Sequence, residues 1–249
     1  MKERFGAKDP RSLALRFHAQ TAGSTLQARQ IDVNVVRVTL QALAAVLGGT
    51  QSLHTNAYDE ALALPSEESA GIALRTQQII AEESGVAETI DPLGGAYLIE
   101  RLTADLVSRA FGEIEKIDAL GGALAGIERG HQQRAIEESA YRYQREVESG
   151  ERKIVGVNAF VTEDEEARIP TLRVDESVGE RQRERLAALR STRDDAAASA
   201  TRAALRAAAA GSANLIPFIA SAARAGVTLG EICADLRDAF GTYVPADRG

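Results

Sequence analysis

The sequence GGTQSLHTNAYDEALALP, residues 48–65, is a dense polar run between two segments that are expected to form helices. Ahead of it, residues 33–47 space apolar side chains at helical intervals, and two glycines end the pattern. Behind it, Ser66 is a suitable N-cap for a second helix that ends at Gly85. Polar runs bounded by core-forming elements commonly hold binding or catalytic residues. A solvated loop is the alternative interpretation.

Strand and helix patterns alternate around this run. Residues 12–20 alternate apolar and polar side chains, as in a buried strand, and residues 50–56 are short enough to be the next strand. The order strand, helix, strand, helix predicts a parallel α/β architecture, in which sites lie at the carboxyl ends of strands. Arg16, His18 and Gln20 share the polar face of the first segment, so they are candidates to face a ligand.

The second half of the chain is expected to be mostly helical. A long helix is predicted over residues 97–120, and two helices joined near Gly130 follow it. Residues 153–160 have the pattern of a short strand. Residues 177–210 are predicted to form one long helix, and two more helices follow with a break near residues 225–227. The α/β alternation therefore ends near the middle of the chain.

Composition limits the kind of protein. The chain has 249 residues, of which 45% are apolar and 4% aromatic, so its core has to be largely aliphatic. The formal net charge of −7 argues against a general nucleic-acid binder. No apolar run approaches the length of a membrane span, and the first residues lack the pattern of a signal peptide. A single cysteine suits a reducing, cytoplasmic environment.

The histidines admit structural interpretations as well as functional ones. His18 and His54 occur with Asp59 and Glu60 in the two polar segments, which is a combination that can hold a metal ion. The same residue types are common in hydrogen bonds, and polar binding of a substrate or cofactor is the better interpretation. His131 lies in a polar helical segment and is expected on the solvated surface. No metal site is therefore predicted.

Three residues near the end of the chain have mainly structural interpretations. Cys233 lies in an apolar helical stripe, which predicts a small buried side chain rather than a nucleophile. Arg202 and Arg206 are expected to lie on a solvated helix face. The sequence contains no phosphate-binding glycine loop, dinucleotide fingerprint or nucleophile elbow.

Five segments occur in one order and at characteristic intervals, namely LRFHAQTAGSTL, LGGTQSLHTNAYDEALALP, EESGV, DPLGGAYLIE and VGVNAF. As a set they resemble the large, catalytic subunit of adenosylcobalamin-dependent acyl-CoA mutases, the methylmalonyl-CoA mutase family, over essentially the whole chain. The resemblance implies a (β/α)8 TIM barrel that binds acyl-CoA along its axis, and a separate flavodoxin-like domain or subunit that holds cobalamin. It also implies radical chemistry, in which homolysis of the Co–C bond precedes a 1,2-shift of the acyl skeleton.

The resemblance implies roles for eight residues. Substrate binding is expected of Arg16, His18 and Gln51, and cofactor binding of Gln20, Gly23, Asn56, Glu60 and Ala63. His18 is expected near the thioester. Asn56 and Glu60 are expected to bind the adenosyl ribose, since their oxygens can accept from hydroxyl groups. Gly23 allows close approach of the corrin because it lacks a Cβ atom, and Ala63 is expected to pack beside the corrin. No residue is assigned as catalytic.

The chain departs from the family pattern in several places. Residues 22–26 read AGSTL where methylmalonyl-CoA mutases usually read SGWSL. This wording is more similar to isobutyryl-CoA or 2-hydroxyisobutyryl-CoA mutase large subunits and to methylmalonyl enzymes with separate subunits. Residues 30–34 read QIDVN in place of paired asparagines, so Asn34 is expected to keep part of that contact. The DxHxxG signature of the cobalamin-binding domain and the early barrel strands are not in this sequence.

We therefore expect residues 1–120 to be the last β/α units of the barrel. Residues 121–249 are expected to be a mostly helical region with one short strand near residues 153–160. The expected function is that of a catalytic-subunit segment of a cobalamin-dependent acyl-CoA mutase, an isomerase of the methylmalonyl-CoA to succinyl-CoA type. An isobutyryl-CoA or 2-hydroxyisobutyryl-CoA mutase large subunit is the alternative within the family.

The expected partners follow from what the sequence contains. The segment is expected to contact only the upper face of adenosylcobalamin and to work in a hetero-oligomer with a cobalamin-binding small subunit or domain. It is expected to be a partial chain that is inactive without the missing strands and that partner, and no nucleic-acid or membrane partner is expected. A non-catalytic interaction module and an inactive truncated remnant are alternatives of another class. The family residues at Gln20, Asn56 and Glu60 favour the enzyme.

Overall fold

The computed structural model describes residues 1–162 and 171–243. The chain divides into two compact units, Met1–Leu172 and Arg173–Gly249, which are described separately. The predicted division at residue 120 into a barrel part and a helical part stays a prediction. Within the described ranges, the helices are all too short or too polar to cross a membrane.

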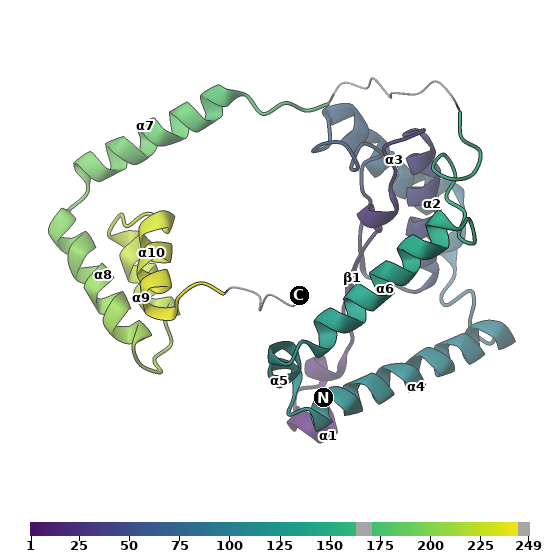
Figure 1. Cartoon of the computed structure of the whole chain (residues 1–249), viewed down its shortest axis with the longest axis horizontal. Coiled ribbons are helices and arrows are strands. Elements are labelled where there is room, and N and C mark those ends of the chain that lie inside the picture. Colours follow the sequence, from purple (N-terminus) through teal and green to yellow (C-terminus); the bar gives the residue numbers. More distant parts are fainter. Residues whose placement is uncertain (163–170, 244–249) are drawn as a thin grey trace. The chain divides into compact units, whose positions relative to one another are not determined.

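Figure 1 labels the α-helices of both units and the strand β1. The elements of the first unit are α1 (Lys2–Phe5), η1 (Pro10–Leu13), β1 (His18–Gln20), η2 (Gly23–Thr25), α2 (Val33–Leu47), β2 (Ser52–His54), α3 (Glu67–Glu83), η3 (Val86–Glu88), α4 (Tyr97–Ala119), α5 (Ala123–Glu128) and α6 (His131–Glu148). The elements of the second unit are α7 (Glu176–Thr192), α8 (Asp195–Ala209), α9 (Ile216–Arg224) and α10 (Leu229–Phe240).

The centre of the first unit is a strand, helix, strand, helix arrangement. β1 and β2 pair in parallel with Gln20 opposite His54, and α2 connects them. α2 buries Val38 and Ala42 and packs against α3, which buries Ala73. This small parallel sheet between helices agrees with the predicted α/β class. Because both strands run in the same direction, the residues that follow them lie at one edge of the sheet.

The elements around the polar run form where the sequence predicts them. The Ser66 hydroxyl accepts a hydrogen bond from the Ser69 amide nitrogen at 3.1 Å, which confirms the N-cap of α3. Gly85 follows the helix with a φ of 71°, a left-handed conformation that glycine adopts readily. The Leu62 amide nitrogen donates to the Asp59 carbonyl oxygen at 2.8 Å, so residues 59–62 form a turn.

The first strand is shorter than predicted. Only His18–Gln20 pairs with β2, and Pro10–Leu13 forms a 3-10 turn instead. Asp9 starts this turn, because its carboxylate accepts from the Arg11 amide nitrogen at 2.9 Å. Leu15 is 78% exposed, so it does not face a core among the described residues. The prediction of a strand from residue 12 was therefore wrong for its first six residues, and the three residues that do pair are exposed or half-buried rather than buried.

The strand predicted over residues 153–160 is a closed loop with one isolated bridge. Gly156 and Phe160 have φ values of 80° and 54°, which a continuous strand does not contain. The Asn158 side-chain oxygen accepts from the Ile154 amide nitrogen at 2.7 Å and closes the loop. The apolar residues in this segment suggest a strand. The Asn158 hydrogen bond and the left-handed conformations of Gly156 and Phe160 produce a loop instead.

His131 is less solvated than the sequence suggests. Its Nε2 atom lies 2.7 Å from Glu113 Oε1 in α4, and its side chain is 28% exposed. The hydrogen bond from His131 lowers the pKa of Glu113. The pair ties the start of α6 to α4.

The second unit contains a bundle of three helices that follows α7. α8, α9 and α10 lie side by side (Figure 1) around a core in which Leu205 is fully buried. Many core residues of α8 are alanines, so the other helices can approach it closely. Cys233 is exposed on α10 rather than buried as predicted, because the core-facing residue of this turn is its neighbour Ile232.

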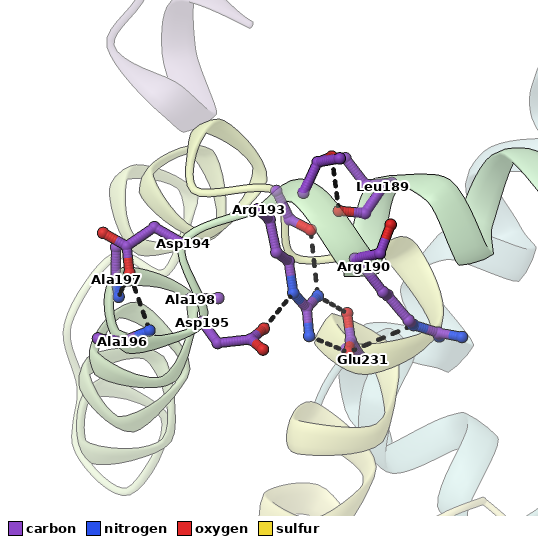
Figure 2. Close-up of polar contacts among 12 residues, drawn as sticks. Leu189, Arg190, Arg193, Asp194, Asp195, Ala196, Ala197, Ala198 and Glu231 are labelled. Atoms are coloured by element: carbon purple, nitrogen blue, oxygen red, sulfur yellow. Dashed lines mark hydrogen bonds and ion pairs between the residues drawn. The ribbon is translucent and has the colours of Figure 1, made fainter.

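A break separates α7 from α8, where the sequence predicts one continuous helix. The Asp194 carboxylate accepts from the amide nitrogens two and three residues ahead, at 2.9 and 3.0 Å, and so begins a new helix. Figure 2 shows the Arg193 guanidinium group between the carboxylates of Asp195 and Glu231. The nitrogen–oxygen distances are 2.9 Å to Asp195 and 2.8 Å to Glu231. These ion pairs hold the break against the start of α10.

A second group of ion pairs involves Arg202, which is half-buried rather than solvated as predicted, and Arg206, which is exposed as predicted. Both guanidinium groups bind the carboxylate of Asp235, which is 2% exposed. The closest distances are 2.8 Å from Arg202 and 2.7 Å from Arg206. The hydrogen bonds from Arg202 and then Arg206 lower the pKa of Asp235. These arginines therefore connect α8 to α10.

We expect the second unit to lose stability in acid. Arg193 lowers the pKa of Glu231, as Arg202 lowers that of Asp235. A carboxylate whose folded pKa is below its unfolded value of about 4 stabilises the fold fully above that value, and this contribution is lost as the pH falls through the folded pKa. Urea unfolding followed by circular dichroism at a series of pH values from about 7 to about 2 measures the loss.

Glu231→Gln is the matched control for this experiment, because glutamine keeps the shape of the side chain and does not titrate. The variant should lose less stability than the wild type between neutral and acidic pH. An identical loss in both proteins would contradict the contribution of Glu231.

Candidate functional site

Polar residues converge where the two parallel strands end. β1 ends at Gln20 and β2 at His54, and the Thr21 amide nitrogen donates to the His54 carbonyl oxygen at 3.1 Å. The chain then enters η2 on one side and the turn of residues 55–65 on the other. Five residues from these two segments meet, and we name them the Gly23 cluster: Gln20, Thr21, Gly23, Asn56 and Glu60.

Asn56 lies at the centre of the Gly23 cluster and is 2% exposed. One polar atom of its side-chain amide lies 3.0 Å from the Gln20 amide nitrogen, and the other lies 3.2 Å from the Gly23 amide nitrogen. Its own backbone nitrogen donates to the Thr21 hydroxyl at 2.9 Å. A buried amide with this many polar partners is held in one orientation.

Gly23 leaves space beside two of the predicted cofactor-binding residues. A Cβ atom at this position would lie 2.7 Å from the side-chain amide of Asn56 and 3.2 Å from Glu60 Oε1. Both side chains would have to move to accommodate it, so the absence of a side chain matters here. Glu60 is exposed, whereas Asn56 is buried. The Glu60 carboxylate is therefore the acceptor that a ligand can reach, whereas the Asn56 amide is buried.

The predicted substrate-binding residues lie at the other end of the strand pair. His18 begins β1, and its Nδ1 atom lies 2.9 Å from Ser52 Oγ. Gln51 precedes β2, and its side-chain oxygen accepts from the Phe17 amide nitrogen at 2.8 Å. Arg16 is exposed and precedes β1. The structure therefore places these residues apart from the Gly23 cluster, and their roles stay predictions.

Ala63, predicted to lie beside the corrin, is half-buried in the turn after β2. Its amide nitrogen donates to the Asp59 carbonyl oxygen at 3.1 Å. Asp59 itself is fully buried, and one of its carboxylate oxygens accepts from the Ser66 amide nitrogen at 3.2 Å. The turn that carries Glu60 is thus tied to the start of α3.

Sequence reasoning misses Thr21 and Thr55 and assigns no structural role to Asn34, and all three are buried polar residues that hold this region. Asn34 is fully buried, and its side-chain nitrogen donates to the carbonyl oxygens of Gln27 and Tyr58 at 2.8 and 2.9 Å. Thr55 is buried as well, and its hydroxyl donates to the Ala73 carbonyl oxygen at 2.7 Å. Thr21 and Thr55 each come directly after a strand. A hydroxyl residue at that place is the signal that could have identified them.

The electrostatic surroundings of the turn are negative. Burial raises the pKa of Tyr58, and the carboxylates of Glu68, Asp59 and Asp32 raise it further. A negative environment disfavours a free anion and suits a neutral ligand whose hydroxyl groups donate hydrogen bonds. Among the described residues, no group of three or more His, Cys, Asp or Glu side chains is placed to hold a metal ion.

A hollow of about 470 Å³ lies elsewhere on the first unit, along α2. Its lining includes the apolar side chains of Val36, Leu40 and Val155. Its accessible lining is mostly apolar, whereas polar groups are what fix the orientation of a bound ligand. The Gly23 cluster is therefore the better candidate for a specific site.

A parallel strand pair with polar residues at its carboxyl edge is typical of α/β proteins. In this class of protein, ligands bind beyond the carboxyl ends of the strands. The particular family follows from comparison of sequences. The chain belongs to the methylmalonyl-CoA mutase family, which matches residues 1–242. This confirms the resemblance that the five sequence segments indicate.

Individual relatives cover nearly all of this chain. It is 48% identical over 244 residues to the 2-hydroxyisobutanoyl-CoA mutase large subunit of Aquincola tertiaricarbonis, which covers 98% of this chain and 43% of the relative. It is 48% identical over 241 residues to methylmalonyl-CoA mutase of Escherichia coli strain K12, covering 96% of this chain and 34% of that protein. The mitochondrial enzyme of Homo sapiens is 43% identical over 250 residues, covering 100% of this chain and 33% of its own length. The chain thus spans well under half the length of these relatives.

Proposed function

We propose that this chain is a catalytic-subunit segment of an adenosylcobalamin-dependent acyl-CoA mutase. In this proposal residues 1–120 are the last β/α units of a (β/α)8 barrel, and residues 121–249 form the helical region that follows them. The observation that carries the proposal is the Gly23 cluster, because it brings four of the five predicted cofactor-binding residues together at the carboxyl edge of a parallel strand pair.

The residues of the Gly23 cluster fit the upper, adenosyl face of the cofactor. Gly23 leaves room that a Cβ atom would fill, and Glu60 offers an exposed carboxylate at its edge. A carboxylate accepts from ribose hydroxyl groups, while Gln20 and Asn56 fix the surface on which the ribose rests. When bound, the cofactor supplies a radical that abstracts hydrogen from the acyl group. The chain's own residues bind and orient the cofactor and the substrate, and they exclude water.

Exposed apolar side chains support the proposal that further structure covers the first unit. Leu15 and Phe17, which precede β1, are 78% and 38% exposed, and α4 has no buried residue despite its amphipathic pattern. Surfaces of this kind on a soluble protein usually mark an interface. We assign them to contacts with the earlier barrel strands and with a cobalamin-binding subunit or domain.

We propose that the acyl group is selected by parts of the relatives that lie outside the matched segment. Identity is 48% both to a 2-hydroxyisobutanoyl-CoA mutase and to a methylmalonyl-CoA mutase, so similarity favours neither acyl group. Arg16, His18 and Gln51 are proposed to contact parts of the acyl-CoA that all these substrates share. We propose that the earlier barrel strands recognise the acyl group.

A chimera tests the proposed function. The matching segment of E. coli methylmalonyl-CoA mutase is replaced by residues 1–242 of this chain, and conversion of methylmalonyl-CoA is measured with and without adenosylcobalamin. We expect cofactor-dependent conversion by the chimera and none by the isolated chain. A folded chimera with no activity would contradict the proposal, and turnover by the isolated chain would contradict the proposed need for the remaining strands.

A further inference from the structure

Thr21 is a buried polar residue in the Gly23 cluster to which the resemblance assigns no role. It lies between two predicted cofactor-binding residues, Gln20 and Gly23, and is 5% exposed. A side chain this buried does not reach a ligand by itself. Its contacts therefore decide what it does.

The Thr21 hydroxyl makes two contacts with one residue on the neighbouring segment. It accepts from the Asn56 backbone nitrogen at 2.9 Å and lies 3.2 Å from the Asn56 side-chain amide. The Thr21 backbone nitrogen donates to the His54 carbonyl oxygen at 3.1 Å. One residue thus continues the strand pairing through its backbone and fixes the next segment through its side chain.

The hydroxyl satisfies a backbone group that has no strand partner. Asn56 lies beyond the end of β2, so its N–H group is outside the strand ladder, and it is buried. A buried N–H group without an acceptor costs folding free energy. The Thr21 hydroxyl supplies the acceptor and so avoids this cost. The same hydroxyl restrains the side chain of Asn56, which contacts Gly23 and Gln20.

The opposite end of the turn is fixed independently. The Asp59 carboxylate accepts from the Ser66 amide nitrogen, and the Asp59 carbonyl oxygen accepts from the amides of Leu62 and Ala63. Glu60 follows Asp59 directly, and its amide nitrogen donates to the carbonyl oxygen of Ala57, the residue after Asn56, at 3.1 Å. The position of Glu60 beside Gly23 therefore depends on both ends of the turn, and Thr21 holds the end nearer the strands.

We propose that Thr21 is a positioning residue, whose hydroxyl sets the place of Asn56 and, through the turn, of Glu60 against Gly23. The inference rests on the proposed function for its effect on the cofactor, but the geometry it describes belongs to this chain alone. It predicts that the hydroxyl, and not the bulk of the side chain, is what matters.

Hydrogen exchange in the full chain tests the structural part. Thr21→Val keeps the side-chain volume and removes the hydroxyl, and Thr21→Ser keeps the hydroxyl. Thr39→Val is the matched control, because the Thr39 hydroxyl donates only to the Val35 carbonyl oxygen within α2. We expect amide exchange in peptides that contain residues 55–63 to be faster by about tenfold in Thr21→Val, the effect of leaving one buried N–H group unsatisfied. Thr21→Ser and Thr39→Val should leave it unchanged.

The cofactor readout uses the chimera described above. Thr21→Val should raise the KM for adenosylcobalamin by about tenfold while the KM for methylmalonyl-CoA stays the same, and Thr21→Ser should restore the wild-type value. Unchanged exchange in Thr21→Val, or an equal change in both KM values, would overturn the positioning role. If the wild-type chimera has no activity, the proposed function fails, and the exchange comparison still decides the role of Thr21.

Discussion

Replacing Gly23 with valine is expected to lower adenosylcobalamin-dependent turnover of the chimera by about 100-fold, the usual effect of displacing a positioned group by about 1 Å. The first added carbon would lie 2.7 Å from the Asn56 amide and 3.2 Å from Glu60 Oε1. The Asn56 amide is buried and bonded to Gln20, so it cannot move without breaking those contacts. The branched carbons of valine would add to the displacement and fill the space proposed for the cofactor.

Gly71→Ala is the control for this substitution. Gly71 lies in α3, and a Cβ atom there meets no atom within 4 Å. That variant should keep the turnover of the parent chimera, because alanine is compatible with a helix. Steady-state rates at saturating acyl-CoA measure both variants. A Gly23→Val chimera as active as the Gly71→Ala chimera would show that the space beside Gly23 is not used.

Replacing both Arg202 and Arg206 with methionine is expected to destabilise the second unit by about 3 kcal/mol, the lower end of the range for removing the partners of a buried charge. The Asp235 carboxylate is 2% exposed and depends on these two guanidinium groups. Methionine keeps most of the aliphatic stem that each arginine packs with, so the loss is mainly electrostatic. Urea unfolding of the full chain, followed by circular dichroism, measures the change.

The triple variant Arg202→Met, Arg206→Met, Asp235→Leu separates charge from packing. It removes the isolated carboxylate and should recover most of the lost stability, because an apolar group of similar size avoids the desolvation cost. If the triple variant is as unstable as the double variant, the arginines act through packing rather than through Asp235.

The local sequence predicts the central elements of the first unit well. α2 and α3 have a helical spacing of apolar residues and clear stop signals, and both form close to the predicted bounds. The strand at residues 12–20 is overpredicted, because alternation records only which side chains are apolar. It does not record that Asp9 and Pro10 start a 3-10 turn or that a partner pairs with only three residues.

Long-range polar contacts explain what the sequence does not predict. Arg202 and Asp235 are 33 residues apart, and the pattern of a single helix cannot name a partner on another helix. The break before α8 is different, because the Asp194 cap ahead of an alanine run is a local signal. The family pattern predicts binding roles for Gln20, Gly23, Asn56 and Glu60, and the fold brings these residues together. The burial of Asn56 and its bond to Thr21 depend on how two segments meet.

In the proposed function, this chain provides a cofactor-facing wall of a mutase whose other parts select the acyl group. The most direct measurement compares residues 1–242 placed in two hosts, the E. coli methylmalonyl-CoA mutase and the A. tertiaricarbonis large subunit assembled with the rest of its enzyme. Each chimera is given methylmalonyl-CoA and 2-hydroxyisobutanoyl-CoA, with and without adenosylcobalamin. We predict that each converts the substrate of its host, within about tenfold of the host's rate and only with the cofactor. Folded chimeras that show no cofactor-dependent conversion, or that share one substrate regardless of host, would contradict the claim.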